Sequence, residues 1–161
     1  MRQTLCILFL FLSSILPARA QQASKIKISY LEQRLKQPDT LFIVNFWATW
    51  CGPCVAELPG FNRIDSAWKG KPVKVLLVSL DFPEAFPLKL NNFLVGKRIQ
   101  AQVLWLDESD ANIFIPKISH DWSGAIPATL FSCVNTGTRD FQEKKLSYDE
   151  LDSKIKACIK K

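Results

Sequence analysis

Two cysteines separated by two residues are the feature of this sequence that most directly indicates chemistry. Cys51 and Cys54 stand in residues 50–54, which read WCGPC. If a helix starts at this segment, both sulfurs lie on one helical turn, where a small disulfide ring closes with little movement of the backbone. The spacing predicts redox dithiol chemistry, in which Cys51 attacks and Cys54 resolves.

The elements expected around this segment favour a reactive first cysteine. The apolar run at residues 41–47 predicts a strand, and residues 52–68 are compatible with a helix. Cys51 would then cap the helix, where unpaired amides and the positive end of the helix dipole stabilise a thiolate. Gly52 would let a partner's backbone approach closely. Pro53 suits the first helical turn because it lacks an N–H group and fixes φ.

A zinc site is the main alternative use of two cysteines at this spacing. It would need two further Cys or His ligands at short spacing. The remaining candidates, His120, Cys133 and Cys158, stand apart from one another in the sequence. We therefore predict no metal centre and no cofactor.

The first twenty residues have the organisation of a secretory signal. Arg2 precedes an apolar run at residues 5–16, and residues 17–20 (PARA) end in a small-x-small cleavage motif. The run is shorter than the roughly 20 residues that a membrane span needs, which makes an uncleaved anchor the weaker alternative. We expect residues 1–20 to be a signal peptide cleaved after Ala20, and residues 21–161 to be one domain, periplasmic or otherwise exported.

The charge distribution gives no support for nucleic-acid binding. The formal net charge of +6 would fall to +4 once Arg2 and Arg19 are removed with the signal. The remaining lysines are scattered, with a cluster only at residues 144–161. A solvated helix face explains that cluster most simply, and a membrane-surface role is the lesser alternative.

Apolar periodicity predicts strands that alternate with helices along the rest of the chain. After a first short helix, the predicted order β, α, β, α, β, α, β, β, α specifies a mixed sheet with helices on both faces. The predicted elements are a helix opened by a capping box at residues 29–32, a strand at 41–47, a helix at 52–68, a strand at 73–80, a helix at 83–98, a strand at 103–106, a helix at 109–118, a hairpin of 128–134 and 138–141, and a last helix opened by a capping box at 147–150.

The dithiol at a strand-to-helix junction, with an Ile-Pro pair before a late strand, resembles the thioredoxin-fold proteins, and specifically the secreted TlpA-type thiol:disulfide oxidoreductases. The resemblance covers residues 25–160 and rests on residues 45–54 (NFWATWCGPC), 57–59 (ELP) and 124–129 (GAIPAT). It implies a central mixed sheet flanked by helices, with a helix-strand-helix region between the second central strand and a cis-proline loop.

The resemblance also implies a substrate-binding surface around the dithiol. Pro127 should follow a cis peptide bond, and the backbone of Ile126 should pair with an extended substrate segment. Trp50, Gly52 and Pro53 should line the same surface, together with Trp122.

One departure from the thioredoxin pattern changes the expected proton chemistry. Thioredoxins carry a buried Asp at the position of Asn45, where it helps take the proton from the resolving thiol, and Asn cannot be that base. Glu57 lies three residues beyond Cys54, about one turn along the same helix face, and TlpA-type proteins similar to this one carry a glutamate there. Glu57 is therefore the expected catalytic proton acceptor, with partial burial raising its pKa, and a surface glutamate is the alternative.

The resemblance implies an exported enzyme that reduces disulfides in envelope client proteins through a mixed disulfide. A membrane-embedded thiol reductant of a Gram-negative periplasm would then restore the dithiol, and the protein would act as a monomer without nucleic acid. A disulfide oxidase or isomerase is an alternative within the same chemistry. A peroxidase of the peroxiredoxin type is disfavoured, because Ala48 occupies the position where a Thr is wanted.

A copper-handling chaperone that uses Cys51, Cys54 and His120 as ligands is the alternative outside enzymes. The sequence leaves open whether Cys133 and Cys158 form a second disulfide, since that depends on their distance in the fold. It also leaves open the clients, the electron donor, the reduction potential and the role of residues 81–122.

Overall fold

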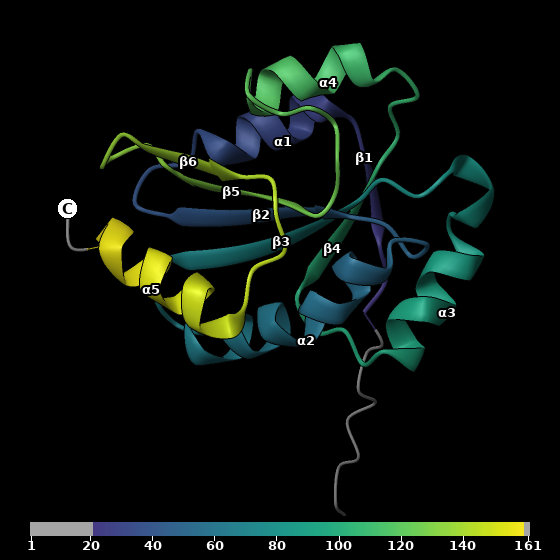
Figure 1. The fold of residues 1–161 in the computed structure, drawn as a ribbon, viewed down its shortest axis with the longest axis horizontal. Helices are drawn as coiled ribbons and strands as arrows, with labels where there is room; N and C mark the ends of the chain where they lie inside the picture. The colour runs from purple at the N-terminus through teal and green to yellow at the C-terminus, as the bar shows by residue number, and fades with distance from the viewer. Residues whose placement is uncertain (1–20, 160–161) are drawn as a thin grey trace, which may run out of the picture.

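The computed structural model describes residues 21–159 (Figure 1). The predicted signal peptide at residues 1–20 lies outside the described residues. None of the helices within residues 21–159 combines the length and the hydrophobicity that a membrane span requires.

Six strands form one mixed sheet through the middle of the domain (Figure 1). They are β1 (Ser24–Ile26), β2 (Leu41–Trp47), β3 (Val73–Ser79), β4 (Gln102–Leu106), β5 (Ala128–Cys133) and β6 (Thr138–Gln142). Their order across the sheet is β1-β4-β3-β2-β5-β6. The first four strands are mutually parallel, whereas β5 runs antiparallel to β2 and β6 runs antiparallel to β5. The predicted mixed sheet with its hairpin is confirmed.

Helices cover both faces of this sheet, as predicted. They are α1 (Ile28–Leu35), α2 (Gly52–Ala67), α3 (Leu88–Gly96), α4 (Ala111–Ile118) and α5 (Tyr148–Ile159). Figure 1 shows α1 and α4 on one face, and α2 and α5 on the other. Each face has its own apolar core, because α1 and α4 bury side chains in one cluster, whereas α2, α3 and α5 bury theirs in the second.

The position of β2 in the sheet explains why residues 41–47 are almost all apolar. It lies in the sheet between β3 and β5, and all seven of its residues are buried. Ile43 and Trp47 point into the core under α2, whereas Phe42, Val44 and Phe46 point into the core under α1. A strand covered on both faces needs apolar side chains on both, so its single polar residue is a departure that needs a reason.

The predicted helix at residues 83–98 is wrong in its first part. The structure has a short 3₁₀ turn at Pro83–Ala85, and α3 begins only at Leu88. Pro87 stands between the two, after a cis peptide bond. A proline lacks an N–H group and disfavours helical geometry in the residue before it, so a helix through Phe86 is not available.

The two predicted capping boxes have different outcomes. Ser147 and Glu150 form theirs as predicted, because the N–H of Glu150 donates to Ser147 Oγ at 3.3 Å and the N–H of Ser147 donates to Glu150 Oε2 at 2.8 Å. The first box is wrong, because α1 already begins at Ile28, with Lys27 as an N-cap that makes no side-chain bond. The N–H of Ile28 donates instead to a carboxylate oxygen of Glu108, at 3.2 Å.

Candidate functional site

Cys51 and Cys54 are joined by a disulfide where β2 leads into α2. Cys51 is the N-cap of α2, and its Sγ atom accepts a hydrogen bond from the N–H of Cys54 at 3.3 Å. Pro53 lies in the first helical turn, where it costs no hydrogen bond. Cys54 is completely buried, whereas 7% of Cys51 is exposed. Cys51 is therefore the sulfur of the pair that another molecule reaches.

The proline loop before β5 lies against this disulfide. The peptide bond between Ile126 and Pro127 is cis, as the resemblance predicts. The carbonyl oxygen of Ile126 lies 3.8 Å from Cys51 Sγ. The structure thus brings together the two segments, 50–54 and 126–127, that the sequence separates by more than 70 residues.

Glu57 is a buried carboxyl group on α2, one turn after Cys54. Only 3% of the residue is exposed, so the alternative of a surface glutamate is wrong. Its Oε1 atom accepts a hydrogen bond from Asn45 Nδ2 at 2.8 Å, and its Oε2 atom accepts one from the N–H of Leu146 at 2.9 Å. Burial raises the pKa of Glu57 to about 7, and the hydrogen bonds from Leu146 and Asn45 and the charge of Lys145 oppose that rise. A carboxyl group with this pKa exchanges protons near neutral pH.

Asp81 is a residue of the site that the sequence analysis missed. It is buried two residues after the end of β3, and its carboxylate accepts hydrogen bonds from the N–H of Thr49 at 3.0 Å and from the Ser79 hydroxyl at 2.7 Å. The indole N–H of Trp105 donates to its backbone carbonyl at 2.8 Å. The available signal was a charged residue directly after an apolar strand, since functional groups gather at the carboxyl ends of parallel strands.

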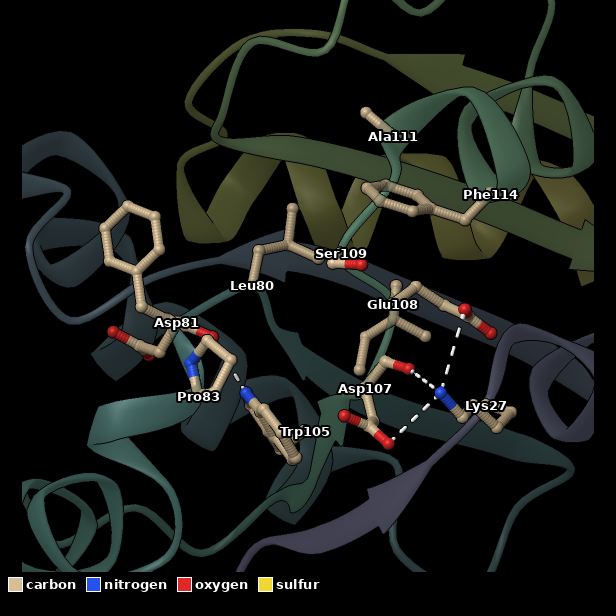
Figure 2. Close-up of a pocket in the computed structure, with 12 residues that line it drawn as sticks. Lys27, Leu80, Asp81, Pro83, Trp105, Asp107, Glu108, Ser109, Ala111 and Phe114 are labelled. Atoms are coloured by element: carbon tan, nitrogen blue, oxygen red, sulfur yellow. Dashed lines mark hydrogen bonds and ion pairs between the residues drawn. The ribbon is translucent and has the colours of Figure 1, made fainter.

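Exposed aromatic rings flank the disulfide on the Asp81 side. Trp50 is 59% exposed and Phe82 is 66% exposed, and their rings stack with centroids 6.0 Å apart. Phe82 also lines a cavity of about 360 Å³ at the carboxyl ends of β3 and β4. Figure 2 shows Trp105 and Phe114 on the walls of this cavity.

The rim of the cavity is charged. Lys27 lies between Asp107 and Glu108, with its Nζ atom 3.1 Å from Asp107 Oδ2 and 3.9 Å from Glu108 Oε2 (Figure 2). The cavity therefore has apolar walls and an ion-paired edge. Residues from the 81–122 region, whose role the sequence left open, supply most of the lining of this cavity.

Three residues singled out in the sequence lie elsewhere. Trp122 is buried between the rings of Phe46, Phe114 and Phe141, so the expectation that it lines the substrate surface is wrong. His120 is not part of any group of three potential metal ligands within residues 21–159. Among the described residues Cys133 is a buried free thiol, and it forms no disulfide with Cys158.

Comparisons with known proteins agree with this arrangement. Residues 22–91 match the sequence profile of the thioredoxin family. The thiol-disulfide oxidoreductase ResA of Oceanobacillus iheyensis is 30% identical over 119 residues, which are 68% of this chain and 53% of that protein. The thioredoxin of Rickettsia felis is 37% identical over 59 residues, which are 37% of this chain and 55% of that protein. The chain thus spans about half the length of the curated relatives that it matches.

Among solved structures, the thioredoxin-related protein of Neisseria meningitidis serogroup B superimposes with a TM-score of 0.67 at 26% sequence identity. The match covers 80% of this chain and 90% of that one. A match of this extent reaches well beyond the short segment around the cysteines. The chain therefore contains a thioredoxin-family domain, with ResA-type thiol-disulfide oxidoreductases among its relatives.

Proposed function

We propose that the protein is an exported thiol:disulfide oxidoreductase that reduces disulfides in envelope client proteins. The observation that carries the proposal is the disulfide at the start of α2, with the partly accessible Cys51 next to the carbonyl of Ile126 and the buried Glu57 one helical turn beyond Cys54. Each part has a task in thiol exchange. The ResA relative supports this choice of chemistry.

The first step joins the reduced protein to its client. The Cys51 thiolate attacks one sulfur of the client disulfide, the client S–S bond breaks, and a Cys51–client mixed disulfide forms while the other client sulfur leaves as a thiolate. The amides at the start of α2 stabilise the attacking thiolate, since Cys51 is the N-cap and already accepts the N–H of Cys54. The carbonyl of Ile126, 3.8 Å from Cys51 Sγ, is placed to pair with the backbone of an extended client segment.

The second step releases the reduced client. The Cys54 thiol gives its proton to the Glu57 carboxylate, and the Cys54 thiolate attacks Cys51 Sγ. The Cys51–Cys54 disulfide forms, and the second client sulfur leaves as a thiolate that takes a proton from water. Two electrons have then passed to the client. Because the pKa of Glu57 is about 7, the carboxylate accepts a proton near neutral pH without holding it permanently.

A thiol donor must then restore the dithiol, because the disulfide form cannot reduce a second client. We assign this task to a membrane-embedded thiol reductant. The direction of electron flow remains part of the proposal, and a disulfide oxidase or isomerase is its alternative. A reduction potential of the Cys51–Cys54 pair near about −270 mV would support the reductase, whereas one near about −120 mV would indicate an oxidase.

The client surface of this proposal includes the exposed rings of Trp50 and Phe82. Trp50 directly precedes Cys51 in the chain, its ring stacks on that of Phe82, and Phe82 lines the cavity. An extended client segment that joins Cys51 through its cysteine would cross these rings. Aromatic residues are enriched at protein interfaces, where a few residues carry most of the binding energy.

The copper-handling chaperone remains a weaker candidate. It requires His120 to complete a site with Cys51 and Cys54, and no such group occurs among residues 21–159. Cu(I) binding that is lost in the His120→Ala variant would favour it. Insulin reduction that persists in this variant would count against it.

The reductase proposal is tested by dithiothreitol-coupled reduction of insulin. We expect Cys51→Ala to abolish the activity, because the remaining thiol of the pair, Cys54, is completely buried. Cys133→Ala is the matched control, since Cys133 is a buried free thiol at the far end of β5 and should keep the activity. A Cys51→Ala protein that reduces insulin at the normal rate would contradict the proposal.

A further inference from the structure

Asn45 is the single polar residue of β2, and its side chain is only partly satisfied. It is completely buried. Its Nδ2 atom donates to Glu57 Oε1 at 2.8 Å and to Thr129 Oγ1 at 3.1 Å, and it lies 3.5 Å from the carbonyl oxygen of Ala128. The other end of the same amide, Oδ1, is buried, and no described residue gives it a hydrogen-bond partner. A buried acceptor without a partner costs free energy comparable to a lost hydrogen bond, so it needs an explanation.

This orientation of the amide fits an ionised Glu57. A carboxylate and a backbone carbonyl only accept hydrogen bonds, so Nδ2 must be the end that faces Glu57 and Ala128. Both carboxylate oxygens of Glu57 then face donors, namely Asn45 Nδ2 and the N–H of Leu146. Among residues 21–159, both hydrogen-bond partners of the Glu57 carboxyl group are thus donors, and neither is an acceptor for a proton.

A proton on Glu57 reverses what the carboxyl group needs from its neighbour. The N–H of Leu146 occupies Oε2, so the proton belongs on Oε1, where it faces Nδ2 as a second donor. If the Asn45 amide rotates by half a turn about its Cβ–Cγ bond, Oδ1 replaces Nδ2 and accepts that proton. The Thr129 hydroxyl can rotate to donate to Oδ1 as well, since a hydroxyl group both donates and accepts.

The two orientations are closely balanced in hydrogen bonds. In the observed orientation, Oδ1 of Asn45 is the atom without a partner among the described residues. In the rotated orientation, Nδ2 occupies that position and is the unpaired atom instead. The rotated form also places Oδ1 opposite the carbonyl oxygen of Ala128, and two acceptors repel each other. This contact is the longest of the three that the amide end makes, at 3.5 Å. Leucine would offer neither orientation, and aspartate would add a second negative charge beside Glu57.

We propose that Asn45 is a positioning residue for proton transfer, whose amide donates to ionised Glu57 and, after rotation, accepts from protonated Glu57. The proton is the one that the Cys54 thiol gives up in the resolving step, and it leaves Glu57 when the dithiol is restored. The role in catalysis therefore rests on the proposed function, whereas the rotation itself does not. The buried polar residue of β2 and its unpaired oxygen are thus explained together.

The titratable and charged groups that act on Glu57 are few. Cys54 lies one turn away on α2, and Lys145, from the segment before α5, acts through its positive charge. The other facing groups are the uncharged side chains of Asn45 and Thr129 and the Leu146 amide. The charge of Lys145 favours the ionised carboxylate whichever way the Asn45 amide points. A change in amide orientation therefore reports on the proton of Glu57.

The test is an NMR titration of the oxidised protein between pH 5 and pH 9, where Cys51 and Cys54 do not titrate. We expect the side-chain amide signals of Asn45 to change with the same midpoint as the carboxyl carbon of Glu57. In the Asn45→Leu variant the midpoint of Glu57 should rise by roughly one pH unit or more, the size expected for one lost charge-assisted hydrogen bond. In Asn45→Asp, the two carboxyl groups should titrate in two separated steps.

Asp65 is the internal control for these variants. It is also on α2, and burial raises the pKa of its carboxyl group, opposed by the charges of Lys74 and Lys69. Its midpoint should stay unchanged in Asn45→Leu, because the effect is local to Glu57. If that variant fails to fold, the titration of the wild-type protein decides alone.

Asn45 amide signals that stay constant through the Glu57 transition would overturn the proposal. So would an unchanged Glu57 midpoint in folded Asn45→Leu. Neither result depends on turnover, because the oxidised protein is at rest. A different pair of results separates the two proposals. If the protein does not reduce insulin but the Asn45 and Glu57 signals titrate together, the proposed function is overturned and the amide rotation stands.

Discussion

Thr49, two residues before Cys51, donates both its backbone N–H and its hydroxyl group to the buried carboxylate of Asp81, at 3.0 and 2.5 Å. The loop that presents the dithiol is therefore held from two strands. Strand β2 leads directly into it, and β3 supplies Asp81 from its own carboxyl end. Since a misplacement of reacting groups by about 1 Å can slow a reaction about 10²-fold, Asp81 should affect exchange without touching a sulfur atom.

Asp81→Asn tests this relationship. An amide presents only one acceptor, so it cannot satisfy the Thr49 and Ser79 donors that the carboxylate satisfies. We expect the free energy of unfolding in urea to fall by about 1–3 kcal/mol, with slower insulin reduction. Asp121→Asn, at an exposed site, is the control and should stay within about 0.5 kcal/mol of the wild-type protein. Equal urea midpoints for the two variants would show that Asp81 does not hold the loop.

Glu57→Gln should slow the resolving step. Glutamine cannot accept the proton of Cys54, and general-base catalysis typically contributes at least about 10²-fold. In the wild-type protein this step should slow as the pH falls through about 7, because Glu57 becomes protonated. Stopped-flow measurement of the decay of the mixed disulfide should show a rate that falls around pH 7 in the wild-type protein and no such fall in the variant. Matching rates and matching pH profiles would exclude Glu57 as the base.

The raised pKa of Glu57 also predicts how the free energy of unfolding depends on pH. Its pKa is about 7 in the folded protein against 4.5 for an ordinary glutamate, so the folded state binds more protons than the unfolded state between these values. The free energy of unfolding of the oxidised protein should therefore fall as the pH rises from 5 to 8, by on the order of 2–3 kcal/mol from this group.

Glu57→Gln should lack this part of the slope. The raised pKa of Asp65 contributes in the same direction but is common to both proteins, so it drops out of their difference. Urea unfolding at pH 5, 6.5 and 8 provides the measurement. Parallel stability curves for the two proteins would mean that Glu57 does not titrate in this window.

Phe82→Ala should weaken client binding. The exposed ring of Phe82 stacks on Trp50 beside the dithiol, and loss of an aromatic interface residue often costs about 1–2 kcal/mol. We expect kcat/KM for insulin to fall about tenfold, with no change in the reaction with oxidised glutathione, which is too small to cross both rings.

Val134→Ala is the matched control for Phe82→Ala. Val134 is an exposed apolar residue just after β5. Ser132 of β5 pairs with Phe42 at the start of β2, so Val134 lies at the opposite end of the sheet from the dithiol, which follows the end of β2. Its kcat/KM for insulin should be unchanged. Equal losses in both variants, or none in Phe82→Ala, would remove Phe82 from the client surface.

Local features of the fold could be predicted from the sequence, and features set by distant partners could not. Both candidate capping boxes have the pattern Ser-x-x-Glu, yet only the one at Ser147 forms. At the other, Glu108 reaches Ile28 from 80 residues away and lets the helix begin earlier. The motif describes a local competition that a tertiary contact overrides.

The same distinction applies to the site. The dithiol, its position at the helix start and the proline loop follow from short motifs and the family resemblance. The contact of Asp81 with Thr49 depends on the pairing of Trp47 with Ser79, which fixes how far β3 extends beside β2. No pattern within either segment carries that register. Likewise, the burial of Trp122 depends on three aromatic rings from separate elements.

The most direct test of the central claim is to trap the mixed disulfide. The reduced Cys54→Ala variant is mixed with a peptide that contains one disulfide, and the products are identified by intact-mass and peptide mass spectrometry. The attack of Cys51 without a resolving thiol predicts a stable one-to-one adduct at Cys51. Cys51→Ala should form an adduct much more slowly than Cys54→Ala, because its remaining thiol of the pair, Cys54, is completely buried. No adduct on Cys54→Ala, or equal adducts on both variants, would contradict the account.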